Sequence, residues 1–131
     1  MTHVLVIDDE STIRWSIEQT LRAAGYTVAL AENGTEGMRL FRELDPAVVL
    51  LDVRLPDEDG FTLLDRMVES RRGTAVIVMT AFDDMRTPAD AMRLGATAYL
   101  KKPFDFDALA AEVCKALEAY PVVGGGDANR S

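Results

Sequence analysis

The sequence predicts an α/β fold, a five-stranded parallel sheet in the order 2-1-3-4-5 with five helices distributed over both faces. Short apolar runs alternate with helical patterns along the chain, and the runs at 4–7, 47–51 and 75–79 are apolar throughout, as strands buried on both faces are. The runs at 27–31 and 98–100 are more polar, which is typical of edge strands. Because parallel strands are joined by right-handed crossovers, this pattern favours the stated order, with a switch point between strands 1 and 3.

Capping and breaking residues mark where the helices begin and end. Ser11 or Thr12 can cap the first helix, and Gly25 ends it. Asn33 and Gly34 are expected to make the turn before the second helix, and Pro88 suits the first turn of the fourth. The helices are therefore expected to run from about 11 to 25, from 34 to 44, from 61 to 70, from 88 to 94, and onward from 105 or 107.

The length of 131 residues fits one domain, predicted over residues 1–120. Residues 121–131 are rich in glycine and are expected to form a flexible tail or the start of an interdomain linker. The sequence contains no apolar stretch long enough to span a membrane and no signal-peptide pattern, so a cytoplasmic location is expected. The net charge of −8 argues against direct contact with nucleic acid. A single cysteine excludes an internal disulfide.

Polar and charged residues stand where four of the predicted strands end. Asp8 and Asp9 follow the first strand, Asp52 the third, Thr80 the fourth and Lys102 the fifth. Carboxyl ends of parallel strands meet at one edge of the sheet, where ligands bind in open α/β folds. Carboxylates, a hydroxyl and an ammonium suit a divalent metal ion and a phosphoryl group. Crowded carboxylates should also raise at least one pKa. The pattern indicates a phosphorylatable switch domain.

Four motifs together carry a resemblance to a known family. They are Val-Ile-Asp-Asp-Glu at 6–10, Leu-Leu-Asp-Val-Arg-Leu-Pro at 50–56 with a glycine at 60, Met-Thr-Ala at 79–81, and Lys-Pro-Phe at 102–104. In this order, and at strand ends, they resemble the receiver domain of bacterial two-component response regulators, over roughly residues 3 to 120.

The resemblance implies a role for each matching residue. Asp52 would accept a phosphoryl group from a phosphohistidine, in a phosphorelay that depends on Mg²⁺ or Mn²⁺. The metal ligands would be Asp8, Asp9, Asp52 and the backbone carbonyl of Arg54. Thr80 and Lys102 would contact the phosphoryl group, Tyr99 would turn inward as the switch, and Pro103, after a cis peptide bond, would have a structural role together with Pro56 and Gly60.

Four segments resemble those in the receivers of NtrC-like transcription activators: Ser-Thr-Ile-Arg-Trp at 11–15, Asp-Val-Arg at 52–54, Thr-Ala-Phe at 80–82 and Lys-Pro-Phe-Asp at 102–105. This likeness implies a sensor histidine kinase as partner, an output domain outside the chain, and possible homodimer formation on phosphorylation. Such a domain is a switch rather than a turnover enzyme. Kinases of this family dock near the first helix, on which Trp15 is expected to be exposed. Gly37 stands where relatives usually have alanine, at an expected cost of up to about 1 kcal/mol.

Three other interpretations stay open on the sequence. A free-standing receiver of the CheY type would act by binding a target protein. A small phosphatase with an aspartate nucleophile would need a second acid two residues after the first, where Arg54 stands. A flavin-binding module of similar topology would need a phosphate-binding loop after strand 1, where the acidic Asp8-Asp9-Glu10 would repel a phosphate.

Overall fold

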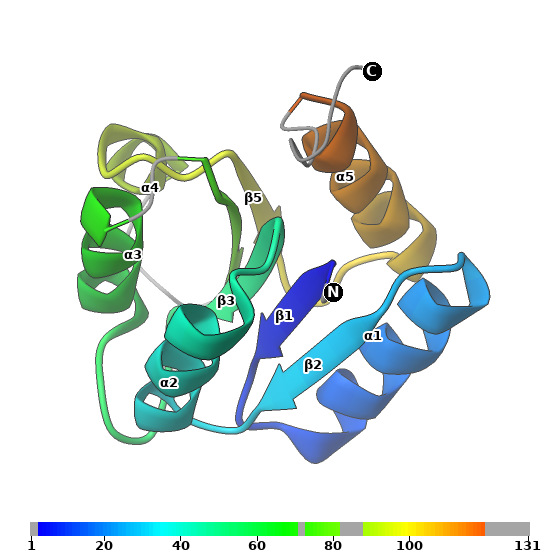
Figure 1. Ribbon diagram of the computed structural model, residues 1–131, viewed down its shortest axis with the longest axis horizontal. Helices are drawn as coiled ribbons and strands as arrows, with labels where there is room; N and C mark the ends of the chain where they lie inside the picture. The colour runs from blue at the N-terminus through cyan, green and yellow to red at the C-terminus, as the bar shows by residue number, and fades with distance from the viewer. Residues whose placement is uncertain (1–2, 71–72, 82–87, 120–131) are drawn as a thin grey trace.

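A computed structural model describes residues 3–70, 73–81 and 88–119. The expectations for the tail at 121–131 concern residues outside these ranges. Strands and helices alternate along the described chain (Figure 1). In chain order the elements are β1 (Val4–Ile7), α1 (Ser11–Ala23), β2 (Val28–Ala31), α2 (Gly34–Leu44), β3 (Val48–Asp52), α3 (Gly60–Ser70), β4 (Ala75–Thr80), α4 (Pro88–Arg93), β5 (Ala98–Lys101) and α5 (Phe106–Ala119).

The five strands form one parallel sheet in the order β2-β1-β3-β4-β5, which confirms the predicted topology. Val4 pairs with Val28 on one side of β1 and with Val48 on the other. The chain therefore turns away in opposite directions after β1 and after β3, and the switch point lies between these two strands. Helices α1 and α5 cover one face of the sheet, and α2, α3 and α4 cover the other (Figure 1).

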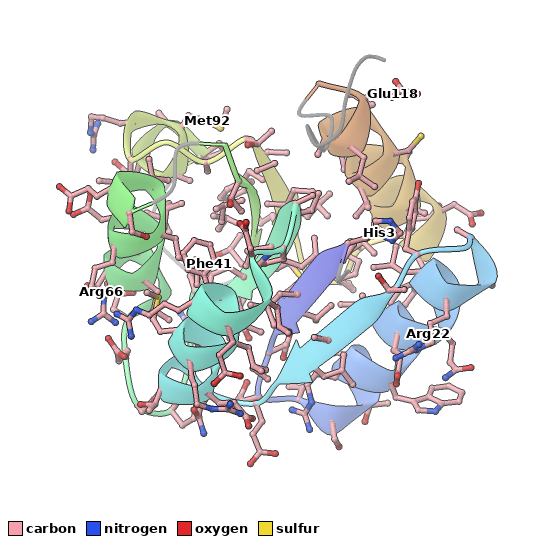
Figure 2. The ribbon with its side chains drawn as sticks, in the orientation of Figure 1. His3, Arg22, Phe41, Arg66, Met92 and Glu118 are labelled. Atoms are coloured by element: carbon pink, nitrogen blue, oxygen red, sulfur yellow. The ribbon has the colours of Figure 1, made fainter. Side chains whose placement is uncertain are left out.

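The two faces of the sheet have separate apolar cores because side chains alternate along each strand. In β1, Leu5 and Ile7 pack under α2 and α3, whereas Val4 and Val6 pack under α1 and α5. All residues of β1, β3 and β4 are buried, which explains their apolar runs. Phe41 of α2 is fully buried, and Figure 2 shows it directed toward the sheet.

Most helix boundaries lie within two residues of the prediction, but the start of α1 is built differently. Its N-cap is Glu10, whose side chain makes no capping hydrogen bond, so neither Ser11 nor Thr12 is the cap. Gly25 follows the helix with a φ of 96°, as its proposed role as helix terminator requires. Helix α4 begins at Pro88, as expected. The lone Cys114 is exposed on α5.

Helix α2 is capped by two acceptors, one of them distant in the sequence. Asn33 Oδ1 accepts a hydrogen bond from the Glu36 amide at 2.8 Å. The Asp57 carboxylate, from the loop after β3, accepts from the Gly34 amide at 2.8 Å and from the Thr35 amide at 2.9 Å. The Thr35 hydroxyl donates to it at 2.7 Å, and these bonds lower the pKa of Asp57 to about 2, the hydroxyl contributing most. The loop that follows Asp52 is thereby fixed to α2.

Gly37 fits its position for a reason that the helical pattern does not reveal. A Cβ atom there would lie 2.6 Å from Cδ1, 3.0 Å from Cγ1 and 3.1 Å from Cγ2 of Ile7 in β1. Helix α2 thus lies too close to the sheet for a methyl group. The expectation that alanine would make the helix more stable was based on helix propensity and did not include this contact with Ile7.

We expect Gly37→Ala to destabilise the protein by about 1–3 kcal/mol despite the higher helix propensity of alanine, because the methyl group overpacks the core. Urea unfolding measures the effect. Ile7→Val removes the nearest atom, so the double variant should be less destabilised than the sum of the two single variants. A stabilised Gly37→Ala protein would show that propensity outweighs packing here.

Among the described residues, no helix is long and apolar enough to cross a membrane.

Candidate functional site

Two buried carboxylates lie side by side at the carboxyl edge of the sheet. Asp52 is the last residue of β3, and Asp8 directly follows β1. Ile7 and Leu51, the residues before them, are partners in the register of these adjacent strands. Asp8 is fully buried and Asp52 is 3% exposed. The sheet topology therefore brings together two acids that are 44 positions apart in the chain (52 − 8), as the strand-end pattern predicts.

Both aspartates are oriented by the same local device. The Glu10 amide donates to Asp8 Oδ1 at 2.9 Å, and the Arg54 amide donates to Asp52 Oδ1 at 3.0 Å. In each case the donor is the backbone N–H two residues further on, an arrangement to which short acidic side chains are suited. One oxygen of each carboxylate is thus held by the backbone, and the other, Oδ2, contacts Lys102.

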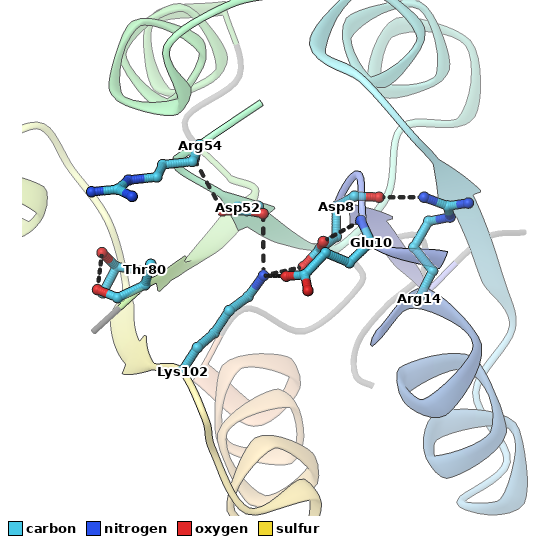
Figure 3. A network of polar contacts seen from close by, with 8 residues as sticks. Asp8, Glu10, Arg14, Asp52, Arg54, Thr80 and Lys102 are labelled. Carbon is cyan, nitrogen blue, oxygen red and sulfur yellow. Dashed lines mark hydrogen bonds and ion pairs between the residues drawn. The ribbon is translucent and has the colours of Figure 1, made fainter. Parts of the chain in front are cut away.

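Lys102 joins the acids from across the sheet (Figure 3). Its Nζ lies 2.8 Å from Asp8 Oδ2, 3.2 Å from Asp52 Oδ2 and 3.0 Å from Glu10 Oε1. The Lys102 amide donates to the Thr80 carbonyl at 2.7 Å, which extends the pairing of β5 with β4 by one residue. We call Asp8, Glu10, Asp52 and Lys102 the charged cluster.

Burial and charge act against each other in this cluster. Burial is the largest effect on Asp52 and raises its pKa; the charge of Asp8 raises it further. The hydrogen bond from the Arg54 amide and the charge of Lys102 lower it. Together these effects raise the pKa of Asp52 to about 6. For Lys102, burial alone would lower the pKa, but the hydrogen bond with Asp8 and the charges of Asp52 and Asp8 outweigh it, so the pKa is raised. The expected rise of a carboxyl pKa is therefore found, with desolvation rather than mutual repulsion as its largest cause.

The donor set of the cluster fits a hard divalent cation. Asp8, Glu10 and Asp52 each offer a carboxylate oxygen, and these three atoms lie within 4.8 Å of one another. Asp8 Oδ2 is buried and, apart from its ion pair with Lys102, has no hydrogen-bond partner among the described residues. Such an oxygen can coordinate a metal ion, and Mg²⁺ and Mn²⁺ prefer carboxylate oxygens as ligands.

The third carboxylate of this group is Glu10, which is not among the site residues predicted from the sequence. The predicted ligand Asp9 is exposed and lies outside the group. Asp9 as a ligand and the Arg54 carbonyl as a ligand stay predictions. The run of three acids at 8–10 indicates that Glu10 lies near the site. Nothing in the local sequence indicates that its side chain reaches Lys102.

The side chains of the two residues predicted to act as the switch have partners other than the charged cluster. Thr80 is buried, and its hydroxyl donates to the Ala81 carbonyl at 3.4 Å rather than to a member of the cluster (Figure 3). Tyr99 is half-buried and packs against the core under α2, α3 and α4.

The residues predicted to have structural roles are Pro103, Pro56 and Gly60. The Lys102–Pro103 peptide bond is cis. Pro56 is exposed in the loop after β3. Gly60 begins α3, and its amide donates to the Val53 carbonyl at 2.8 Å.

An apolar pocket of about 340 Å³ opens beside the charged cluster. Glu10 and Lys102 form its polar side. Trp15, on the same helix as the pocket residue Ile13, is 61% exposed, as its position on α1 predicts. The remaining lining residues are Ile13, Ala81, Pro103, Phe104 and Phe106.

The sheet is doubly wound and parallel, and the charged cluster lies at its switch point. These features define a class of α/β domain in which charged side chains, not a phosphate-binding loop, occupy the carboxyl edge of the sheet. The profile of the response regulator receiver domain matches residues 4–114. The chain therefore belongs to the response regulator receiver domain family, the receivers of two-component systems.

Similar proteins include two transcription regulators of Escherichia coli K12. The chain is 40% identical to the DNA-binding transcriptional regulator NtrC over 117 residues, which cover 89% of this chain and 25% of NtrC. It is 36% identical to the regulatory protein AtoC over 118 residues, covering 90% of this chain and 26% of AtoC. The chain thus spans about a quarter of the length of these relatives and is related to NtrC-like activators through its receiver domain.

Solved structures show the same fold. A response regulator receiver domain protein from Clostridium thermocellum superposes with a TM-score of 0.85 at 34% identity, covering 91% of this chain and 96% of that one. The receiver domain of NtrX from Brucella abortus superposes with a TM-score of 0.82 at 29% identity, covering 88% and 98% of the two chains.

Proposed function

We propose that this domain is a phosphorylation switch in which Asp52 accepts a phosphoryl group from a phosphohistidine of a sensor histidine kinase. The observation that supports this proposal most strongly is the setting of the Asp52 carboxylate. One of its oxygens is held by the Arg54 amide, and the other lies 3.2 Å from Lys102 Nζ at the carboxyl edge. Such an oxygen is oriented for attack, with a cation beside it.

The transfer forms one oxygen–phosphorus bond and breaks one phosphorus–nitrogen bond. A carboxylate oxygen of Asp52 attacks phosphorus, the phosphorus–nitrogen bond of the phosphohistidine breaks, and the imidazole leaves as a neutral ring after taking up a proton. Lys102 supplies positive charge to the phosphoryl oxygens. Mg²⁺ or Mn²⁺ would neutralise charge on the phosphoryl group. Asp8 and Asp52 would hold the ion. The further ligands would be either Glu10, or Asp9 and the Arg54 carbonyl as predicted from the sequence.

The output would be a change in packing rather than a released product. Thr80 would turn its hydroxyl toward the phosphoryl group, and Tyr99 would move inward behind it, changing the surface of α4, β5 and α5. In this proposal the domain is a switch that gains and loses one phosphoryl group, not a turnover enzyme.

The relatives indicate the kind of protein in which this switch would act. NtrC is named as a DNA-binding transcriptional regulator, and its receiver segment is a quarter of its length. We infer a cytoplasmic regulator with an NtrC-like output domain outside these residues and without nucleic-acid contact by the receiver itself. A phosphorylation-dependent homodimer is part of this proposal. The free-standing CheY-type alternative predicts the same chemistry with a separate target protein.

We expect incubation with acetyl phosphate and Mg²⁺ to add the mass of one phosphate to the intact protein. Asp52→Asn and EDTA should each abolish the gain, because the first removes the nucleophile and the second the cation. Intact-protein mass spectrometry reads both, and Asp65→Asn on the exposed part of α3 is the matched control. A full gain in Asp52→Asn would refute the acceptor.

We also expect millimolar Mg²⁺ to raise the unfolding temperature by several degrees, because the ion binds the folded carboxylates and not the unfolded chain. At one hundred times the Kd, the gain in free energy of unfolding is about 2.7 kcal/mol. Differential scanning calorimetry measures the shift. Asp8→Asn should reduce the shift strongly, and an equal shift in wild type and Asp8→Asn would contradict the site.

A further inference from the structure

The three acidic partners of Lys102 differ in how much solvent they contact. The side chains of Asp8 and Asp52 are 0% and 5% exposed, whereas that of Glu10 is 59% exposed. Glu10 occupies the N-cap position of α1 but makes no capping hydrogen bond. Its carboxylate instead reaches Lys102 Nζ at 3.0 Å, 92 positions further along the chain.

We propose that Glu10 is a positioning residue that holds the Lys102 ammonium over the buried aspartates until a phosphoryl group takes its place. This inference rests on the proposed function, because it assumes that Asp52 is the acceptor. A lysine ammonium has three N–H donors, and Lys102 has three acidic partners. Lys102 donates hydrogen bonds to Glu10 and Asp52 and forms an ion pair with Asp8, so a new phosphoryl oxygen competes with these partners for the ammonium.

Burial decides which partner is exchanged. Asp8 is fully buried, so losing the ammonium would leave its charge without compensation in a site of low dielectric constant. Glu10 is exposed, and water can solvate its carboxylate when the pair opens. Because water solvates the released Glu10 carboxylate and Lys102 keeps its two aspartate partners, opening this pair costs little and the exchange is reversible. Glu10 thus orients Lys102 in the resting state without locking it there.

The position of Glu10 also separates this role from one in maintaining the fold. Its side chain forms one side of the open pocket beside the cluster and belongs to neither apolar core. Replacing its carboxylate with an amide keeps its size and its place at the start of α1, and removes the charge that competes for Lys102. The amide also removes a candidate metal ligand, so the comparison requires Mg²⁺ concentrations that saturate each variant.

Beryllofluoride, a mimic of the phosphoryl group, provides a test that needs no chemical step. Its affinity is measured by calorimetry at Mg²⁺ concentrations that saturate each variant. Glu10→Gln should bind it about two- to fivefold more tightly than wild type, the range expected for releasing an exposed ion pair. In the Lys102→Ala background the same substitution should have no effect. Glu43→Gln, which removes an equal charge from the exposed end of α2, should leave the affinity unchanged.

Two results would overturn the proposal. One is an unchanged or weaker affinity of Glu10→Gln for beryllofluoride. The other is that Glu10→Gln changes the affinity equally in the wild-type and the Lys102→Ala backgrounds. If binding to Lys102→Ala is too weak to measure, the ¹⁵Nζ chemical shift of Lys102 decides. Glu10→Gln should change this shift in the free protein and leave it unchanged in the beryllofluoride complex; the opposite pattern contradicts exchange. Failure of the proposed function is distinct, because Asp52→Asn would then bind beryllofluoride as well as wild type does.

Discussion

Replacing Gly60 with alanine is expected to destabilise the domain by about 3 kcal/mol or more, the largest effect that we predict for a single methyl group. A Cβ atom at this position would lie 2.3 Å from Val53 Cα, 2.6 Å from the Asp52 carbonyl oxygen and 2.9 Å from the Val53 carbonyl carbon. All three are backbone atoms, so no side chain can rotate away. Helix α3 would have to retreat from the end of β3.

The retreat would affect the site as well as the fold. The Gly60 amide donates to the Val53 carbonyl at 2.8 Å, and the Val53 amide donates to the Met79 carbonyl at 3.1 Å. Displacing Val53 therefore disturbs the backbone that carries Asp52 and the Arg54 amide. We expect lower stability together with slower labelling by acetyl phosphate.

Urea denaturation followed by circular dichroism measures the loss of stability. Gly73→Ala is the matched control, because a Cβ atom there would meet no atom of the described residues within 4 Å, and its effect should stay within about 0.5 kcal/mol. A Gly60→Ala protein as stable as the Gly73→Ala protein would contradict the close contact between α3 and β3.

Asp52→Asn is expected to stabilise the metal-free domain at pH 7.5 by up to about 3 kcal/mol. Burial raises the pKa of Asp52 from 3.8 to about 6, so the folded state binds a proton more tightly than the unfolded state does. The stability that this proton confers is fully present below pH 3.8 and is lost as the pH rises through about 6. Above that window wild type bears the cost of a buried charge, whereas an asparagine amide does not ionise.

The sign of the pH dependence makes this prediction specific. In EDTA, the advantage of Asp52→Asn should be large at pH 7.5 and should shrink as the pH falls toward 4.5. The amide retains the geometry needed to accept from the Arg54 N–H, and Lys102 retains Asp8 and Glu10 as partners. Urea unfolding at several pH values measures the difference. An advantage that does not vary with pH, or a less stable variant at pH 7.5, would show that Asp52 is not desolvated as described.

The fold could be predicted from the sequence because its central strands are buried on both faces. Strands such as β1 and β3 are then apolar up to their carboxyl ends, which are marked by the first charged side chain, Asp8 after β1 and Asp52 as the last residue of β3. The parallel order places those ends at one edge, so the proximity of Asp8, Asp52 and Lys102 followed from topology without knowledge of any distance.

Contacts that depend on tertiary approach could not be predicted in this way. Glu10 reaches Lys102, and Asp57 caps α2 from a loop more than 20 positions away, but both are exposed acids without a distinctive local pattern. The fit of Gly37 depends on how closely α2 approaches Ile7, which helix propensity does not report. The burial that governs the pKa of Asp52 is likewise a property of the assembled site.

The most direct test of the central claim is to locate the phosphoryl group chemically. Protein labelled with acetyl phosphate and Mg²⁺ is reduced with borohydride, which converts an aspartyl phosphate to homoserine, and its peptides are sequenced by mass spectrometry. The proposed function predicts homoserine at position 52, absent when Mg²⁺ is omitted. Homoserine at another aspartate, or a stable phosphate on a serine, threonine or histidine with position 52 unmodified, would contradict Asp52 as the acceptor.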